Sequence, residues 1–306
     1  MGSIRNLLIT GSNGFVGQSF LSYLEKLEER ELPKKIFLVN RSESKPISYK
    51  IRSRTEIISL TADLTKEWKF DTESSHILNL AGDGSKNAYT EEAAQNFIKI
   101  CENLEIWALS HKPKVIVHAS SGACFYGDSN SKDFINKSNF ILSRIKGEKI
   151  LARLNIELGT RVVTARLFTF IGPNILNKLH YAATIFIRDS MRSSLINVTG
   201  NPDTIRSYMH ESTMSDWLAN CLRNEKIEGI FSVGSSNPVT IRELAEFISS
   251  KTNAKIIFGN TKIEPSTYLP NNESNYKTLG FSEGPKWQDS VMECISIYSK
   301  RGMHLE

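Results

Sequence analysis

The sequence predicts an α/β protein with a doubly wound, Rossmann-like parallel sheet and a smaller C-terminal α/β lobe. Short β-branched apolar runs alternate with longer helical patterns in the first half, and a glycine-rich turn follows the first run. Pro and Gly interrupt the second half repeatedly. We therefore expect one domain over residues 1–172 and a smaller lobe over 173–306, with an approximate boundary and room for the chain to return to the sheet.

The first domain contains a series of predicted strands. They are the β-branched runs at 4–10, 34–40, 56–61, 75–82, 113–120 and 161–168. Apolar residues at helical spacing predict helices over 15–27, 90–110 and 139–158. Because strands that alternate with helices form right-handed crossovers, we expect a parallel sheet with ligands at the carboxyl ends of its strands.

The smaller lobe mixes shorter elements. Helical patterns cover 181–193, 212–224, 240–251 and 287–300. Short strands are predicted at 195–200, 205–210, 229–234 and 254–259. We expect this lobe to cover the crevice at the strand ends.

Composition indicates a globular protein of enzyme size. The 306 residues are 40% hydrophobic and 23% charged, and no apolar run reaches the roughly 18 residues of a membrane helix. The chain enters a strand almost at once, so we expect no signal peptide and a cytoplasmic location. Four widely spaced cysteines predict neither disulfides nor a metal site. The net charge of +5 is scattered, which argues against nucleic acid and fits a small anionic ligand.

The segment LLITGSNGFVGQSF carries glycines at 11, 14 and 17, directly after a strand and at the opening of a helix. Glycine permits a tight turn and close approach of the backbone to a pyrophosphate, while the helix N-terminus supplies N–H groups and a positive dipole. The segment therefore predicts a dinucleotide site. A tight turn without a ligand is the alternative.

The end of the second strand bears on the choice of dinucleotide. An acidic residue there would bind the ribose of NAD, whereas this chain has Asn40, Arg41 and Ser42, a donor-rich, cationic group suited to a 2′-phosphate. We favour NADP(H), with NAD(H) and a merely solvated Arg41 as alternatives. Asp63 follows the third strand, where a carboxylate reaches the adenine amino group or simply caps a helix.

At this point the chain resembles the extended short-chain dehydrogenase/reductase family, the NAD-dependent epimerase/dehydratase group that acts on nucleotide sugars. The matching motifs extend over nearly the whole chain: TGSNGFVG (10–17), NLAG (79–82), SSGACFYG (120–127), RLFTFIGP (166–173), IRSYMHESTMSDW (205–217), FSVGSSNPVTIRELAEFI (231–248) and YKTLGF (276–281).

The resemblance implies a set of site residues and a homodimer. The implied cofactor contacts are Gly11, Asn13, Gly14, Phe15, Val16, Gly17, Asn40, Arg41, Ser42, Asp63, Leu64, Leu80, Ala81, Gly82 and Arg144. The implied substrate contacts are Tyr126, Asn174 and Arg206. Arg206 would grip the diphosphate of a sugar nucleotide as a planar bidentate donor, with a surface salt bridge as the alternative.

The likeness fails at the catalytic residues. The family uses a Ser or Thr after the fifth strand and a YxxxK pair on the next helix. Alignment on Tyr126 puts Gly122 at the hydroxyl position, while the helix places Phe140 and Arg144 at the Tyr and Lys positions. A slip of one residue would return Ser121 to the hydroxyl role.

Arg144 can retain the hydrogen bonds and charge of a lysine, but a phenylalanine has no proton to give. Loss of a general acid costs roughly 10² to 10⁴ in rate. Tyr126 is the first substitute that the sequence suggests, and Cys124, Asp83 and Lys86 are less favoured. Dehydration is set aside, because the Asp-Glu pair of the family's dehydratases is replaced by alanine and cysteine at 123 and 124.

Three hypotheses follow. The first is an atypical NAD(P)-dependent nucleotide-sugar oxidoreductase, of 4-ketoreductase or epimerase type, in which Ser121, Tyr126 and Arg144 are the candidate catalytic residues. The second is a non-catalytic NADP or nucleotide-sugar binding or regulatory protein, favoured by the residues at 122 and 140. The third is an enzyme of the same fold with a substrate that is not a sugar nucleotide.

Overall fold

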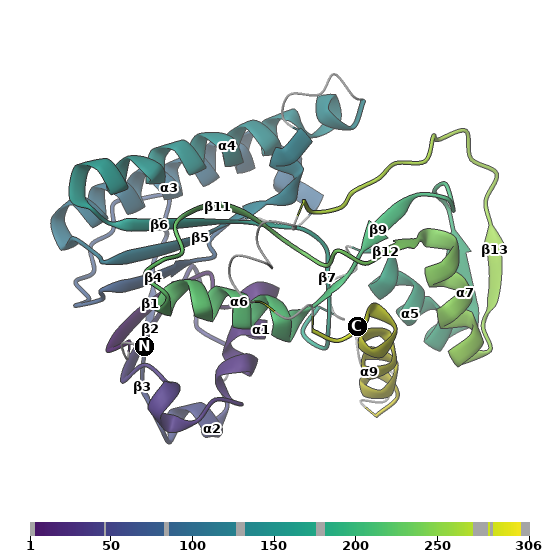
Figure 1. The fold of residues 1–306 in the computed structure, drawn as a ribbon, viewed down its shortest axis with the longest axis horizontal. Coiled ribbons are helices and arrows are strands. Elements are labelled where there is room, and N and C mark those ends of the chain that lie inside the picture. Colours follow the sequence, from purple (N-terminus) through teal and green to yellow (C-terminus); the bar gives the residue numbers. More distant parts are fainter. Residues whose placement is uncertain are drawn as a thin grey trace. The chain divides into compact units, whose positions relative to one another are not determined.

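The computed structural model describes residues 4–45, 47–82, 86–126, 132–175, 181–271, 281 and 284–300, without the side chains of 86, 87, 126 and 132–137. Figure 1 shows the chain as a ribbon. It forms two compact units. Unit 1 comprises Met1–Leu167 and Ser215–Phe231, and unit 2 comprises Phe168–Met214 and Ser232–Glu306.

Unit 1 is built on a seven-stranded sheet with the order β11-β6-β5-β4-β1-β2-β3. Strands β1 to β6 pair in parallel, which confirms the predicted doubly wound sheet. Their bounds are Asn6–Thr10 (β1), Lys35–Asn40 (β2), Glu56–Thr61 (β3), His76–Asn79 (β4), Val115–Ser121 (β5), Arg161–Leu167 (β6) and Gly229–Val233 (β11).

Burial along the strands follows their place in the sheet. Every residue of the central strand β1 is buried, whereas the edge strand β3 has no buried residue and alternates between exposed and half-buried side chains over much of its length. This difference is expected, because an edge strand is covered less completely than a central one. Because β1, β2, β4 and β5 are parallel, their carboxyl ends lie at one edge of the sheet.

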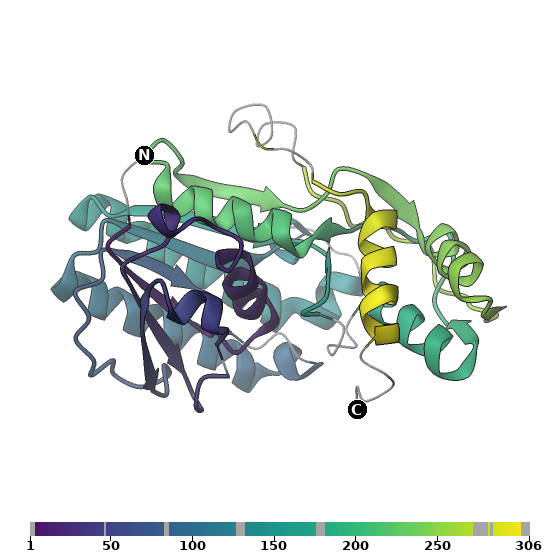
Figure 2. The same cartoon turned by 90° about the horizontal axis from the view of Figure 1, so that it is seen from below.

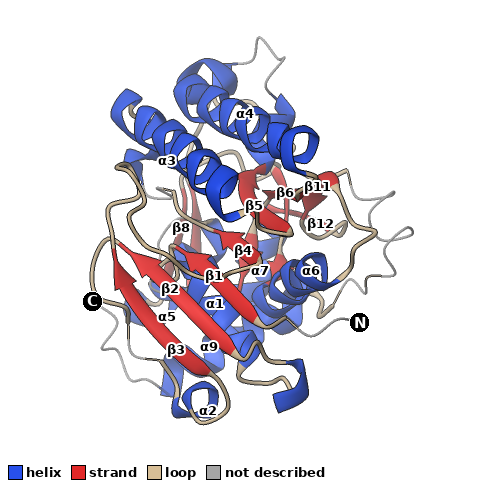
Figure 3. Cartoon of the chain, turned by 90° about the vertical axis from the view of Figure 1, so that its left-hand side faces the viewer, coloured by secondary structure: helices blue, strands red, loops and turns tan. Residues whose placement is uncertain are grey.

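Helices cover both faces of the sheet (Figures 1 and 3). α3 (Glu91–His111) and α4 (Lys132–Leu158) lie on one face. α1 (Phe15–Leu24) and α6 (Glu211–Arg223) lie on the other, where the Tyr23 hydroxyl donates to Asp216 over 2.6 Å. Thr90 caps α3 by accepting from the Ala93 N–H. The core between the sheet and α3 and α4 contains Leu104, Trp107, Leu151 and Leu154, all nearly inaccessible to solvent.

Unit 2 has three two-stranded sheets. These pair β7 (Phe170–Ile171) with β10 (Met209–His210), β9 (Ile205–Ser207) with β12 (Pro238–Thr240), and β8 (Leu195–Val198) with β13 (Lys255–Phe258). The helices α5 (Ala182–Ser193), α7 (Ile241–Thr252) and α9 (Trp287–Lys300) are neighbours (Figure 2). They share a core that includes Ile187, Leu244 and Val291. Within the described ranges, no helix is both long and apolar enough to cross a membrane.

The structure differs from the sequence expectation in two places. The run at 229–234, expected as a strand of the lobe, forms β11 beside β6 in the large sheet. Pairing between segments so far apart in sequence leaves no local signal. α4 begins at Lys132, before the apolar pattern that predicts it.

Compactness divides the chain at Leu167 and includes residues 215–231 in the first unit. The expected boundary at 172 was approximate and left room for the chain to return to the sheet.

Candidate cofactor and active site

The glycine-rich loop joins β1 to α1 with no room for larger side chains. Gly11 has φ +68°, and a Cβ placed on it would lie 2.8 Å from the Leu80 carbonyl oxygen. A Cβ on Gly17 would lie 2.5 Å from the Ser12 Cα. The loop therefore needs glycine at both positions, and it leads into a helix whose first turn carries no acidic residue. An unblocked helix N-terminus of this kind attracts phosphate.

A buried chain of polar side chains links the ends of β1, β4 and β5. The Thr10 hydroxyl donates to the Asn79 Oδ1 over 2.6 Å and accepts the N–H groups of Leu80 and Ala81. The Asn79 amide lies 3.0 Å from His118 Nδ1. These bonds fix the three strand ends against one another, and they hold Leu80 and Ala81 beside the glycine-rich loop.

His118 is the innermost member of this chain. It is fully buried, and burial, aided by the positive charge of Arg144, lowers its pKa to about 3. A neutral ring that accepts at Nδ1 from the Asn79 amide carries its proton on Nε2. Within the described part of the chain, Nε2 has no hydrogen-bond partner. His118 is thus a neutral structural group in the pH range of ordinary enzymes.

Asn40, at the end of β2, points into the loop. Its Oδ1 accepts the Asn13 N–H over 3.1 Å, and its amide donates to Ser12 Oγ over 2.8 Å and to Ser44 Oγ over 3.1 Å. A further bond joins the glycine-rich loop to the segment after β2, because the Asn13 amide donates to the Glu43 carbonyl over 2.8 Å. Asn40 is buried and saturated by these contacts, so the exposed side chains at this edge are those that follow it.

Arg41 and Ser42 follow Asn40 and are exposed. Asp63, after β3, accepts from both the N–H and the hydroxyl of Thr65, and these bonds, mainly, hold its pKa below the usual value. The positive charge of Arg41 adds to the same shift. Arg41 and Asp63 follow the ends of the paired strands β2 and β3, at one corner of the sheet.

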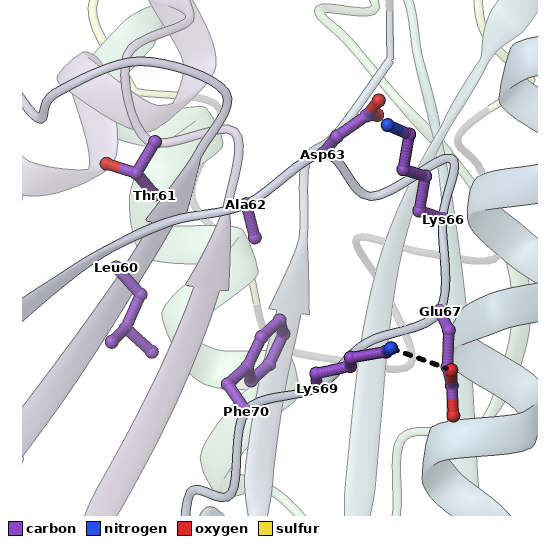
Figure 4. Close-up of a pocket in the computed structure, with 8 residues that line it drawn as sticks. All are labelled: Leu60, Thr61, Ala62, Asp63, Lys66, Glu67, Lys69 and Phe70. Carbon is purple, nitrogen blue, oxygen red and sulfur yellow. Dashed lines mark ion pairs between the residues drawn. The ribbon is translucent and has the colours of Figure 1, made fainter.

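A hollow of about 520 Å³ lies beside this corner (Figure 4). It is lined by Leu60, Thr61, Ala62, Asp63, Lys66, Glu67, Lys69 and Phe70. Its lining mixes charged side chains, among them the Lys69–Glu67 ion pair at 3.7 Å, with the apolar Leu60, Ala62 and Phe70. Leu64, which follows Asp63, is turned into the core and its carbonyl accepts from Trp68 Nε1.

The end of β5 is anchored to α4 and β6. The Ser120 hydroxyl donates to Glu148 Oε1 over 2.5 Å, and Arg166 forms a bidentate pair with the same carboxylate at 3.0 and 2.6 Å. Glu148 is 3% exposed. Ser121 is half-buried, and its Oγ accepts the Ala123 N–H over 3.2 Å, which starts the 3₁₀ turn Gly122–Tyr126.

Arg144 is held between two aromatic rings. Its guanidinium carbon lies 3.5 Å from the centre of the Phe97 ring and 4.7 Å from that of Phe140. The side chain is 7% exposed, and a Cβ on Gly82 would lie 2.9 Å from its Nη1. The guanidinium therefore occupies the space that Gly82 leaves open after β4, with cation–π contacts to two rings.

The other candidate proton donors are either buried or outside the described residues. Cys124 is buried, and burial raises the pKa of its thiol to about 11, with the charge of Glu148 adding to the rise. Asp83 and the side chains of Lys86 and Tyr126 lie outside the described residues, as does most of the YKTLGF segment. None of the predicted donors that the structure describes is therefore both exposed and acidic.

Of the three predicted substrate residues, Arg206 and Asn174 lie in unit 2, whereas Tyr126 belongs to unit 1. Arg206, on β9, donates from Nη1 to the carbonyls of Ile205 and Ser266 and from Nη2 to Ser266 Oγ. Asn174 donates from its backbone and its amide to the two oxygens of Glu211, over 3.0 and 2.7 Å. Both side chains are thus positioned by neighbours within their own unit.

Sequence reasoning missed several residues that organise the site. Glu148 lies one turn after Arg144 on α4, and a carboxylate that precedes the buried Ile150, Leu151 and Leu154 at helical spacing is the signal that would have drawn attention to it. His118 and Asn79, inside apolar strands, give the same signal. The contact of Phe97 with Arg144 joins two helices, and nothing local predicts it.

Two comparisons place this chain among known sequences and folds. A dTDP-4-dehydro-6-deoxyglucose reductase of Escherichia coli is 24% identical over 269 residues, 83% of this chain and 84% of the reductase. Among solved structures, a UDP-N-acetylglucosamine 4-epimerase of Methanobrevibacter ruminantium in complex with UDP-N-acetylmuramic acid has TM-score 0.81 at 17% identity, covering 98% of this chain and 100% of its own. MoeE5 in complex with UDP-glucose and NAD has TM-score 0.77 at 18% identity, covering 97% and 99%.

The family model for the NAD dependent epimerase/dehydratase family matches residues 7–234. This range begins in β1, includes the glycine-rich loop, and extends to the end of β11. The match covers most of the chain and agrees with the Rossmann-like sheet. The chain therefore belongs to the NAD dependent epimerase/dehydratase family.

Proposed function

We propose that the protein is an atypical NAD(P)-dependent nucleotide-sugar oxidoreductase, of 4-ketoreductase or epimerase type, acting in the supply of sugar-nucleotide precursors. The observation that carries the proposal is the tight glycine-rich turn that leads into α1. The Gly11 backbone packs against Leu80, directly after β4, and Gly17, in the first turn of α1, packs against the Ser12 backbone. That geometry suits a pyrophosphate, and the similarity to a dTDP-4-dehydro-6-deoxyglucose reductase supports the reaction class.

The bound dinucleotide would supply or accept the hydride. The loop residues Gly11, Asn13, Gly14, Phe15, Val16 and Gly17 would hold its pyrophosphate, and Leu80, Ala81 and Gly82 would lie along the adjoining strand end. The fixed charge of Arg144 would face the nicotinamide ribose. At the adenosine end, Asp63 and Leu64 would border the base.

We favour NADP(H) over NAD(H) as the cofactor. No carboxylate ends β2, and Asn40 is occupied by the loop, so Arg41 and Ser42 are the exposed groups available to a 2′-phosphate. The structural neighbour MoeE5 is named with NAD, which makes NAD(H) the alternative.

For the substrate we propose a nucleotide diphosphate-sugar. Two structural neighbours are named with UDP-linked sugars. Arg206 would bind the diphosphate, with Asn174 and Tyr126 as further contacts. Arg206 donates from Nη1 to two carbonyls and from Nη2 to Ser266 Oγ, which fixes the guanidinium plane and leaves its Nε–Nη2 edge as the side for a bidentate partner.

A second candidate function is non-catalytic binding. Phe140, at the position of the family's tyrosine, contacts Arg144 through its ring and offers no proton. A protein that keeps the cofactor loop but cannot transfer a proton would bind a dinucleotide or nucleotide sugar and report its presence to a partner.

We also propose a homodimer. Ile106 and Leu109 of α3 and Ile156 of α4 are exposed, at 59%, 42% and 87%, on the helices that cover one face of the sheet. Light scattering tests this, and a monomeric mass throughout the micromolar range would contradict it.

The function is tested by mixing the protein with NADPH or NADH and a set of substrates that includes dTDP-4-dehydro-6-deoxyglucose and UDP-linked keto sugars. A reductase oxidises the cofactor and yields the reduced sugar, while an epimerase yields an isomer without net oxidation. The Gly17→Val variant is the control that should neither bind nor react. Tight cofactor binding without any product would favour the non-catalytic function.

A further inference from the structure

Tyr89 lies against the residue that replaces the family's tyrosine. Its ring meets the Phe140 ring edge-on, with centres 5.4 Å apart and an interplanar angle of 65°. Tyr89 ends the 3₁₀ turn Lys86–Tyr89, which follows β4, and it directly precedes Thr90, the N-cap of α3. The connection from β4 to α3, which Tyr89 closes, follows the carboxyl end of a central strand, the side on which such folds bind ligands.

The contact belongs to a layered arrangement. Phe97, the Arg144 guanidinium, Phe140 and Tyr89 follow one another, with 3.5 Å, 4.7 Å and 5.4 Å between successive groups. Phe97 is buried, whereas Tyr89 is 41% exposed. This series of contacts therefore runs from a buried ring to an exposed one, and its exposed end carries a phenol.

We propose that Tyr89 is the proton donor of this site and replaces the hydroxyl that Phe140 lacks. The inference rests on the proposed oxidoreductase function and names a residue for it. As the hydride of the reduced nicotinamide adds to the carbonyl carbon of the keto sugar, the Tyr89 O–H bond breaks and its proton forms an O–H bond with the carbonyl oxygen. The sugar is reduced, the nicotinamide is oxidised, and water returns a proton to the Tyr89 phenolate.

Neighbouring groups that the structure describes fit this role less well. Cys124 is 5% exposed, and Ser121, whose Oγ accepts the Ala123 N–H, carries an alcohol, which is a far weaker acid than a phenol. His118 is fully buried, and burial lowers its pKa to about 3. Its ring is therefore neutral at neutral pH and does not act as an imidazolium acid. Tyr89 joins two properties that a donor needs, a phenol and exposure to solvent.

The test compares the turnover number of wild type with that of Tyr89→Phe, using NADPH and the keto-sugar substrate that wild type reduces fastest. We expect a loss of about 100-fold, the lower range for removal of a general acid, with NADPH affinity changed less than twofold. Tyr49→Phe is the matched control, because Tyr49 lies on α2 (Tyr49–Arg52) and is 81% exposed. It should keep full activity.

The double variant Tyr89→Phe/Phe140→Tyr separates a lost proton from a disturbed fold. It retains the substitution at 89, so a gain of tenfold or more over Tyr89→Phe reflects a restored phenol. The proposal is overturned if the turnover number of Tyr89→Phe lies within tenfold of wild type. It is also overturned if the double variant turns over no faster than Tyr89→Phe, or if only Tyr126→Phe loses activity. A wild-type protein that reduces no keto sugar overturns the proposed function, and Tyr89's role with it.

Discussion

Among single residues, Arg144 needs the space that the absent side chain of Gly82 leaves open. The guanidinium lies between Phe97 and Phe140 and fills the space above a residue that has no side chain. Displacing it would move the charge that we assign to the nicotinamide ribose. An arginine at this position, longer than the lysine of the family, is accommodated because residue 82 is glycine.

We expect Gly82→Ala to weaken NADPH binding by about tenfold, which is about 1.4 kcal/mol. The new methyl group would lie 2.9 Å from Arg144 Nη1, and the two rings leave the guanidinium little room to yield. In an Arg144→Lys background, the same change should cost less than twofold. Calorimetric titration of the four proteins measures this coupling. Equal losses in both backgrounds would show that the methyl group acts elsewhere.

Arg41 determines the choice of dinucleotide in our account. Arg41→Ala should weaken NADPH binding about tenfold and leave NADH binding within twofold, since only NADPH carries the 2′-phosphate. Titration of both cofactors at one ionic strength checks this. An equal loss of affinity for both cofactors would mean that Arg41 interacts with the phosphates that they share. No loss for either cofactor would mean that Arg41 is a solvated loop residue without a part in binding.

At the scale of elements, α4 is joined to β5 and β6 through one carboxylate. Glu148 accepts from Ser120 and binds Arg166 in a nearly water-free setting. Glu148→Gln removes the charge and leaves Arg166 without its partner. Breaking a buried pair costs about 3 kcal/mol or more in the free energy of unfolding.

Urea unfolding measures this loss. Glu105→Gln is the control, because Glu105 pairs with the 56% exposed Arg153, and exposed pairs contribute at most about 1 kcal/mol. Similar losses in the two variants would contradict the structural role of Glu148.

The elements differ in how far the sequence predicts them. The predicted helix over 90–110 agrees with α3 almost residue for residue, because Thr90 caps its start and Pro113 follows its left-handed C-cap Lys112. The edge position of β11 was not predictable, since it depends on pairing with β6. The same holds within the site. Local spacing predicts the glycine-rich loop, but the inward turn of Asn40 and the stack on Arg144 depend on residues from other elements.

At the scale of the whole molecule, buried histidines link stability to pH. The pKa of His118 is lowered to about 3 and that of His76 to about 4, in both cases chiefly by burial. The unfolded chain therefore binds protons that the folded chain does not, below the ordinary histidine pKa near 6.5. The contribution of these neutral histidines to the free energy of unfolding is complete above about pH 6.5, and it is lost as the pH falls toward their folded-state pKa values.

We expect His118 alone to lower the free energy of unfolding by about 2 kcal/mol between about pH 7 and pH 5. His118→Leu should be less stable than wild type at neutral pH, because Asn79 loses its partner, but its stability should fall less steeply in acid. Urea unfolding at both pH values measures the slopes. A variant with the wild-type slope would mean that His118 does not titrate as burial implies.

The central claim is that hydride moves between a nicotinamide held by the glycine-rich loop and a nucleotide-linked sugar, although phenylalanine stands at the position of the family's tyrosine. Its most direct test is NADPH and NADH carrying deuterium at the transferable position of the ring, incubated with the protein and a nucleotide-linked keto sugar. The account predicts that the label appears on the carbonyl carbon of the product sugar. Product without label from either cofactor, or label that stays on the nicotinamide in every mixture, would contradict it.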